Sequence, residues 1–351
     1  MATLLLAEAG AEVIKIERPG GEDMRRYRPY WGTDSVGFAL LNRGKKSLVL
    51  DLKSEADRAR LVPLLARADI LVEQFRPGVM ARLGLDFERV ATINPRLIYC
   101  SITGYGQTGP KRDVAGHDLN YIGDAGLLAL SMGPPGDPVV PPALIADIAG
   151  AAYPAVINIL LAMTERAQTG KGRHLDIAMT ENLFPFMYWA LGEGHATGHW
   201  PGNGDALVTG GTARYRLYPT RDGKVVAAAP IEQRFWAVFC RLIGLEAEFV
   251  DEKDPAATAA RVAEIIRGRD AAYWRARFAG EDCCCSIVQS AQDAVADPHF
   301  VARGVFAHRL TNAEGQSMPA LPVPIDPGFR GAPEAPLSGP ELGVHRDADL
   351  E

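Results

Sequence analysis

Strand-like and helix-like segments alternate through the first hundred residues, and this alternation limits the possible folds more than any other feature. Short apolar segments typical of strands occur at residues 12–17, 47–52, 70–74 and 97–103. Helix-like segments lie between them, and Ser54 and Asp86 are typical residues for the helix N-cap position. Strands alternating with helices indicate an α/β domain with a mostly parallel sheet. We therefore predict a Rossmann-like large domain.

The start of the chain departs from this pattern. Residues 4–9 are typical of the end of a helix, with Gly10 at the C-terminal cap position. A parallel α/β domain ordinarily begins with a strand. We expect either that this fold lacks such a strand or that the first strand is missing from the sequence.

The pattern changes after residue 191, which predicts a second domain. A polar, glycine-rich stretch at residues 192–213 has the composition of a linker. Asp222-Gly223 then separates two strand-like segments, which is a strong β-hairpin signal, and three helix-like segments follow at 233–243, 256–267 and 271–278. We predict a large domain at 1–191, a smaller α+β domain at 214–319, and a proline-rich segment at 320–351 that packs back on the large domain.

Composition excludes several classes of protein. Acidic residues number 43 and basic residues 37, so an extended nucleic-acid surface is not expected. The longest apolar stretch, residues 148–163, is shorter than the roughly 20 residues that span a bilayer, which favours a buried core helix and no membrane segment. Five cysteines, an odd number, and no signal peptide indicate reduced thiols and a cytoplasmic location.

Three motifs have a more ordinary interpretation than a cofactor site. Residues 104–109 match G-x-G-x-x-G after a strand, but no helix-like pattern follows, so a glycine-rich loop is favoured over a nicotinamide site. His195 and His199 have helical spacing but lie among glycines, which argues against a metal pair. The run Cys283–Cys285 lacks C-x-x-C spacing and is interpreted as a buried reduced cluster. No metal or redox cofactor is therefore expected.

Three ionisable residues are candidates for chemistry. His117 lies in the polar segment 116–121, where Asp118 and Asn120 are equally suited to local side-chain-to-backbone hydrogen bonds. Asp147 precedes an apolar helix, so it is either an N-cap or a functional carboxylate whose following N–H groups stabilise an oxyanion. Glu232 follows a strand and is either a surface carboxylate or the partner of a histidine across a domain cleft.

Basic residues point to an anionic ligand. Arg18 and Arg76 each follow a predicted strand directly. Ligands of open α/β sheets bind beside the carboxyl ends of strands. In an acidic protein this placement fits an anionic small molecule.

Several sequence blocks together resemble one known family. Residues 9–20, 41–48, 75–78, 104–110, 169–172 and 297–304 are similar to the ordered motifs of the family III CoA-transferases, the CaiB/BaiF family. The resemblance covers almost the whole chain. It implies a homodimer of interlocked rings and an acyl-CoA thioester as substrate, with coenzyme A entering as part of that substrate.

The resemblance also implies roles for particular residues. Asp147 matches the family's catalytic aspartate, and His117 and Glu232 match a histidine and its supporting glutamate in the α-methylacyl-CoA racemase branch. Coenzyme A contacts fall on Arg18, Gln74, Phe75, Arg82 and Leu83, and Tyr105 matches a residue near the pantetheine.

Two activities share these residues, and the pairing favours one of them. Inverting a carbon by proton transfer needs one group on each face, which His117 and Asp147 would supply. A CoA-transferase needs only an Asp147 adduct and leaves His117 and Glu232 without a role. We therefore expect a racemase or epimerase of 2-methylacyl-CoA. The alternatives are a family III CoA-transferase and an inactive CoA-binding protein.

Overall fold

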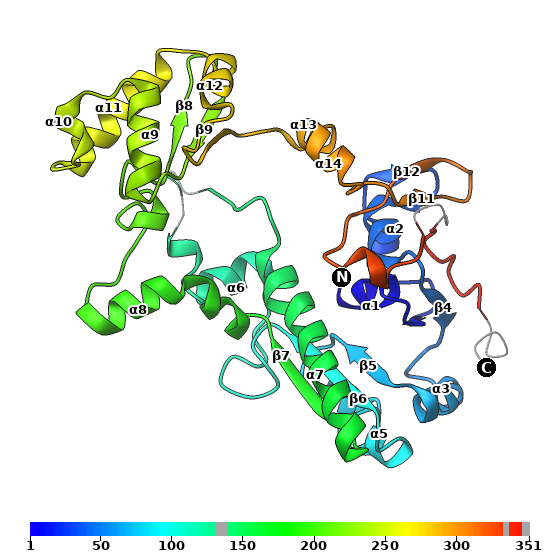
Figure 1. Ribbon diagram of the computed structural model, residues 1–351. Helices are drawn as coiled ribbons and strands as arrows, with labels where there is room; N and C mark the ends of the chain where they lie inside the picture. Colours follow the sequence, from blue (N-terminus) through cyan, green and yellow to red (C-terminus); the bar gives the residue numbers. More distant parts are fainter. Residues whose placement is uncertain (131–132, 134–138, 333–336, 346–351) are drawn as a thin grey trace. The chain divides into compact units, whose positions relative to one another are not determined.

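The structure is a computed structural model that describes residues 1–130, 133, 139–332 and 337–345 (Figure 1). The chain divides into two compact units. The first unit comprises Met1–Tyr121, Ala143–Leu183 and Val295–Glu351, and the second comprises Ile122–Pro142 and Phe184–Ala294. Of the expected C-terminal segment 320–351, residues 333–336 and 346–351 lie outside the described residues.

The first unit contains the predicted parallel strands. Strands β1 (Ile14–Glu17) and β4 (Lys46–Val49) pair in parallel, and β5 (Ile70–Glu73), β6 (Ile98–Thr103) and β7 (His174–Ala178) form a second parallel sheet in the order β5-β6-β7. The parallel α/β class is therefore confirmed. The strands do not form a single continuous sheet, because within the described residues no ladder joins β4 to β5.

Helices cover both faces of the β5-β6-β7 sheet. On one face Ile98, Cys100 and Ile102 of β6 pack against Ala155 and Ile159 of α7 (Tyr153–Thr169). Residues of the other face join a second cluster with β4 and with helices α3 (Glu55–Arg67), α4 (Val79–Arg82) and α5 (Phe87–Ile93). Each buried Leu or Ile side chain contributes about 1.5–3 kcal/mol to this core.

Two of the sequence-predicted helix starts are confirmed by their caps. The Ser54 hydroxyl accepts a hydrogen bond from the backbone N–H of Asp57, and the Asp86 carboxylate accepts one from Arg89. The short helix α4 begins at Val79. Gly78 precedes it with a φ of +80°, a left-handed conformation that favours glycine.

The apolar segment near residue 150 forms a longer helix than expected. A π-helical turn, η3 (Ala146–Ala152), continues directly into α7, so the helix runs over 24 residues, Ala146–Thr169. By length and composition alone it is long and apolar enough to cross a membrane, which is also true of core helices in soluble proteins. The length argument against a span was therefore wrong, although one face of α7 does pack on the sheet.

The second unit contains the predicted hairpin. Strands β8 (Arg216–Pro219) and β9 (Val225–Ala228) are antiparallel, and β10 (Cys285–Ile287) pairs with the other edge of β9. Helices α9 (Gln233–Ile243), α11 (Pro255–Arg267) and α12 (Ala271–Phe278) match their predicted ranges closely. Their apolar faces and the three strands build one core, which contains Trp236, Phe239 and Trp274.

Two expectations for the second unit need correction. The glycine-rich stretch is helical at its start, since α8 (Tyr188–Thr197) includes His195; His199 lies beyond its end, where its Nδ1 is 2.7 Å from Glu193 Oε1. The cysteine run is not buried as a cluster. Cys283 is buried but Cys284 is exposed, with a φ of +49° that turns it out of the core.

C-terminal residues pack on the first unit through buried polar contacts. The Arg43 guanidinium donates to the carbonyl of Leu321 and forms an ion pair with Glu8, at 2.7 and 2.6 Å. Arg330 pairs with the same Glu8 carboxylate, and Arg25 donates to the carbonyl of Pro340. One carboxylate thus joins helix α1 (Ala2–Glu8) to two distant arginines.

The remaining elements are short. They are η1 (Asp23–Arg26), β2 (Tyr30–Trp31), β3 (Asp34–Ser35), α2 (Val36–Asn42), α6 (Asp118–Asp124), η2 (Leu128–Leu130), η4 (Glu181–Met187), η5 (Leu207–Thr209), α10 (Ala247–Val250), α13 (Ala291–Val295), α14 (Pro298–Ala302), β11 (Arg309–Thr311), β12 (Ser317–Pro319) and η6 (Pro327–Phe329).

Candidate active site

A cavity of about 430 Å³ opens in the first unit where β5 and β6 end. Its lining includes four sequence-predicted site residues: Gln74 and Phe75 after β5, Tyr105 after β6, and His117. All four come from segments that follow the carboxyl ends of parallel strands. That edge of an α/β sheet is where ligands ordinarily bind. We call this space the main cavity.

The wall beside β6 depends on close packing around Tyr121. A Cβ atom on Gly104 would lie 2.4 Å from the Tyr121 ring, so only glycine allows the ring to lie there. The Tyr121 hydroxyl donates to the carbonyl of Gly116 at 2.6 Å, and its ring meets that of Tyr105 edge to face at 5.3 Å. Burial raises the pKa of Tyr121, with Asp147 adding to the shift and Arg76 opposing it. The G-x-G-x-x-G segment is therefore a cavity-lining loop, and Tyr121 is a site residue that sequence analysis did not identify.

His117 is held by its own backbone. Its N–H donates to Asn120 Oδ1 at 3.0 Å, and its carbonyl accepts from the N–H groups of Asn120 and Tyr121 at 2.8 and 3.2 Å. The local hydrogen bonding considered for Asn120 is thus correct. It occupies the main chain of His117, and His117 is one of the residues that line the main cavity.

Asp118 connects this segment to the apolar helix. Its buried carboxylate, 6% exposed, accepts a hydrogen bond of 3.0 Å from the backbone N–H of Asp147. The partner lies 29 residues away, so the local hydrogen bond considered for Asp118 was wrong. This contact brings the loop of His117 to the start of the helix that carries Asp147.

Asp147 lies in the first turn of the π-helix η3 and is not its N-cap, which is Ile145. Partial burial raises the pKa of Asp147 and the nearby carboxylate of Asp118 raises it further, while His117 lowers it. The next N–H, of Ile148, donates to Leu144, and that of Asp147 is taken by Asp118. These two N–H groups are therefore not free to hold an oxyanion.

Three other predicted coenzyme A contacts lie outside the lining of the main cavity. Arg82 ends α4 and Leu83 follows it, packed beside the second apolar cluster of the first unit. Arg18 follows β1, where it donates to the Gly21 carbonyl at 3.0 Å and pairs with Asp23 at 2.6 Å. All three belong to the first unit, as do the residues of the main cavity.

Glu232 belongs to the second unit. It is the N-cap residue of α9 but makes no side-chain capping hydrogen bond. Glu232 is exposed, and the pKa of the exposed Cys284 thiol is raised by partial desolvation and by the charge of Glu232. Within the described ranges no group of three or more metal-ligating side chains occurs.

Comparison with known proteins gives a consistent result. The family model of CoA-transferase family III matches residues 1–346. The chain is 34% identical to acetyl-CoA:oxalate CoA-transferase of Acetobacter aceti, covering 97% of this chain and 90% of that protein. It is 32% identical to α-methylacyl-CoA racemase of Mus musculus, covering 97% and 86%.

A solved structure agrees with these sequences. The crystal structure of a CaiB/BaiF family protein from Brucella suis superposes with a TM-score of 0.79 at 28% identity, over 99% of this chain and 93% of that one. The protein therefore belongs to CoA-transferase family III, an enzyme family that acts on CoA substrates. Its relatives include transferases and racemases at similar identity, so the comparisons leave the particular reaction undetermined.

Proposed function

We propose that this protein is a racemase or epimerase of 2-methylacyl-CoA thioesters. The observation that carries the proposal is the hydrogen bond from the Asp147 backbone to Asp118, the residue next to His117. It brings the segment that carries His117 to the start of the helix that carries Asp147, and inversion of a carbon needs an acid and a base of this kind.

The proposed reaction is a 1,1-proton transfer. Neutral His117 removes the α-proton of one epimer, and the electron pair of that C–H bond moves into an enolate of the thioester. The Asp147 carboxyl group then donates its proton to the opposite face of the same carbon. The pair ends as imidazolium and carboxylate, which is the state required for the reverse direction.

Electrostatics support this exchange of roles. Burial and the Asp118 carboxylate both disfavour the charged form of Asp147, so the pKa of its carboxyl group is raised. A raised pKa favours the protonated carboxyl group, which is the form that donates to the enolate.

We further propose that the main cavity receives the pantetheine arm, with Gln74, Phe75 and Tyr105 in contact. Arg18 is proposed for the nucleotide end, where a guanidinium suits phosphate, and Arg82 and Leu83 are proposed as further coenzyme A contacts. Glu232 of the second unit is proposed to support His117. Neither metal nor redox cofactor enters this mechanism.

Exchange of the α-proton tests the proposal. A 2-methylacyl-CoA incubated with the protein in D₂O should lose its Cα–H signal in the NMR spectrum and lose optical purity at the same time. A folded protein that binds the thioester but leaves the signal unchanged would contradict racemase activity on that substrate.

A CoA-transferase is the second candidate, and one observation favours it. Asp147 is only partly buried, so a thioester carbonyl has access to its carboxylate as a nucleophile. In that reaction the carboxylate attacks the acyl-CoA, coenzyme A leaves as thiolate, and an acyl-aspartyl anhydride forms. Transfer of CoA to a free carboxylic acid, with hydroxylamine trapping of an Asp147 adduct, would establish this alternative.

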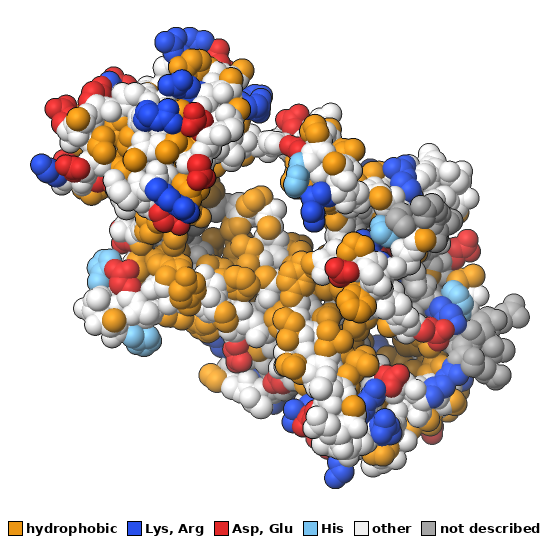
Figure 2. Space-filling view, viewed as in Figure 1, with side chains coloured by type: hydrophobic (Ala, Val, Ile, Leu, Met, Phe, Trp, Pro, Cys, Tyr) orange, Lys and Arg blue, Asp and Glu red, His pale blue; other side chains and the backbone are white. Residues whose placement is uncertain are grey.

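A second copy of the chain is the partner that we propose for α7. Its outer face carries Ile157, Leu160 and Leu161, each more than half exposed, and Figure 2 shows hydrophobic side chains gathered over this helix. Light scattering should give the mass of a dimer, and Leu160→Glu should lower it. A monomeric wild-type protein would contradict the proposal.

We also propose a cytoplasmic location, which the five free cysteines favour.

A further inference from the structure

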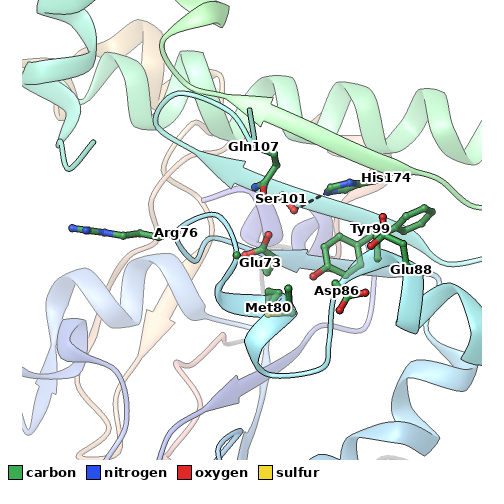
Figure 3. A pocket seen from close by; sticks show the side chains of 12 residues that line it. Glu73, Arg76, Met80, Asp86, Glu88, Tyr99, Ser101, Gln107 and His174 are labelled. Atoms are coloured by element: carbon green, nitrogen blue, oxygen red, sulfur yellow. Dashed lines mark hydrogen bonds between the residues drawn. The ribbon is translucent and has the colours of Figure 1, made fainter. Parts of the chain in front are cut away.

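A second, smaller cavity of about 210 Å³ lies in the first unit, beside the same loop that borders the main cavity (Figure 3). Arg76 borders both cavities, and the loop of residues 74–78 runs between them. The Arg76 side chain extends away from the polar groups at the centre of the smaller cavity (Figure 3). Those polar groups include Glu73, Ser101 and His174.

The sheet register places three polar side chains at paired positions in adjacent strands. Glu73 of β5 pairs with Ser101 of β6, and Ser101 pairs with Asp176 of β7. Residues paired in register project from the same face of a sheet. A row of polar groups therefore crosses one face, although the strands of a parallel sheet covered on both faces are ordinarily apolar.

The hydrogen bonds of this row end at Glu73. The Ser101 hydroxyl donates to the Glu73 carboxylate, and the Ser101 Oγ lies 2.9 Å from His174 Nε2. The imidazole is held by Phe87, stacked at 5.5 Å, and by the edge-on ring of Tyr99 at 5.2 Å.

The Glu73 carboxylate is the end of this chain, and it holds the loop. Its Oε2 accepts a hydrogen bond of 2.8 Å from the backbone N–H of Phe75. Glu73 is buried, and burial raises its pKa against the hydrogen bonds from Ser101 and Phe75. Burying a carboxylate costs free energy unless hydrogen bonds compensate for the lost water. Here one of those hydrogen bonds fixes the backbone of Phe75, which lines the main cavity.

The loop after β6 is also held by hydrogen bonds from its backbone to side chains of the sheet. Asp176 Oδ2 accepts from the backbone N–H of Gln107 at 2.9 Å, and Thr103 Oγ1 accepts from Gly106 at 3.0 Å. Both loops that border the main cavity are thus anchored to side chains at the ends of the sheet strands.

We infer that Glu73 is a positioning residue for acyl-CoA binding, which acts by holding the Phe75 backbone and with it the 74–77 wall of the main cavity. The inference rests on the proposed function, because it takes the main cavity to receive the pantetheine arm of the acyl-CoA. Ser101 and His174 orient the Glu73 carboxylate and do not contact the substrate themselves.

Substitutions at Glu73 test this role. Glu73→Ala removes the acceptor, so the dissociation constant for acyl-CoA should rise about tenfold or more, with kcat changed by less than about threefold. Glu73→Gln keeps an oxygen that accepts from Phe75, so it should bind within about threefold of wild type. Glu88→Ala is the matched control, because it removes a carboxylate from the same smaller cavity and leaves the Glu73–Phe75 hydrogen bond intact.

Glu73→Asp keeps the charge but shortens the side chain by one methylene group, so the acceptor no longer reaches the Phe75 N–H. This variant replaces Glu73→Ala in the binding measurement if the alanine variant does not fold. It should bind acyl-CoA as weakly as Glu73→Ala. Equal binding by wild type and by the alanine or aspartate variant would overturn the inference, as would failure of Glu73→Gln to restore binding. Absence of acyl-CoA binding by the wild type would instead overturn the proposed function.

Discussion

The contact between Asp118 and Asp147 gives the sharpest prediction for the site. Asp118 does two things to its neighbour: it accepts the Asp147 N–H at 3.0 Å, and its charge raises the pKa of the Asp147 carboxyl. Two substitutions separate these effects. Asp118→Asn keeps an oxygen acceptor and removes the charge, whereas Asp118→Ala removes both.

The size of the first effect follows from the hydrogen bond. A backbone N–H that loses its acceptor in a partly buried position costs about 1–3 kcal/mol. Since each 1.4 kcal/mol is a factor of ten, displacement of Asp147 on this scale should lower the racemisation rate of Asp118→Ala by about 5- to 150-fold. Asp118→Asn should lose less than about fivefold at its own optimum pH, because it retains the acceptor.

The second effect appears in the pH profile. In either direction the His117–Asp147 pair carries one proton in total, so activity falls as the pH drops through the Asp147 pKa and the pair takes up a second proton. Removing the Asp118 charge lowers that pKa, so the acid limb of Asp118→Asn should move to lower pH. The assay is kcat/KM for racemisation between pH 4 and 9. An acid limb that stays in place, or equal losses in both variants, would refute this reasoning.

Further predictions concern the supports of the first unit. Glu8→Ala leaves two buried arginines without their shared counter-charge and should lower the free energy of unfolding by about 3–5 kcal/mol in urea denaturation, against less than about 1 kcal/mol for the exposed Glu12→Ala. Gly104→Ala places a Cβ 2.4 Å from the Tyr121 ring. The racemisation assay should therefore show reduced turnover, and urea denaturation should show that the free energy of unfolding falls by about 1–3 kcal/mol. Burial, with Lys15 adding, lowers the pKa of Lys45 to about 7. The unfolded chain binds more protons above that pH, so stability should rise from pH 7 to about 10, and Lys45→Met should abolish this rise.

Local sequence signals predicted many of the elements. Ser54 and Asp86 cap helices as expected, and α9 and α12 have the predicted bounds, because capping and 3.6-residue periodicity depend on nearby residues. The Asp222-Gly223 turn joins β8 and β9 for the same reason, with Gly223 at a φ of +74°.

Features that depend on tertiary contacts were missed. The apolar periodicity at residues 146–152 does not distinguish a π-helix from an α-helix, so Asp147 was placed at a cap that it does not occupy. α8 forms despite Gly192 and Gly194. Gly194 lies against the ring of Trp200, where no other residue fits, and such packing overrides low helix propensity.

The candidate site divides in the same way. Motif resemblance selected Gln74, Phe75, Tyr105 and His117, and these residues share one cavity. The contact of Asp118 with Asp147 joins residues 29 positions apart, and no local sequence pattern predicts it. Glu73 was taken only as part of a strand, since its hydrogen bond to Phe75 depends on how the chain turns after β5.

The most direct test of the two-base proposal follows each epimer separately in D₂O. Wild-type protein should exchange the α-proton of both epimers of a 2-methylacyl-CoA. His117→Ala should exchange only the epimer whose α-proton faces Asp147, and Asp147→Ala only the other. Exchange of both epimers by either variant would contradict the central claim that one group acts on each face.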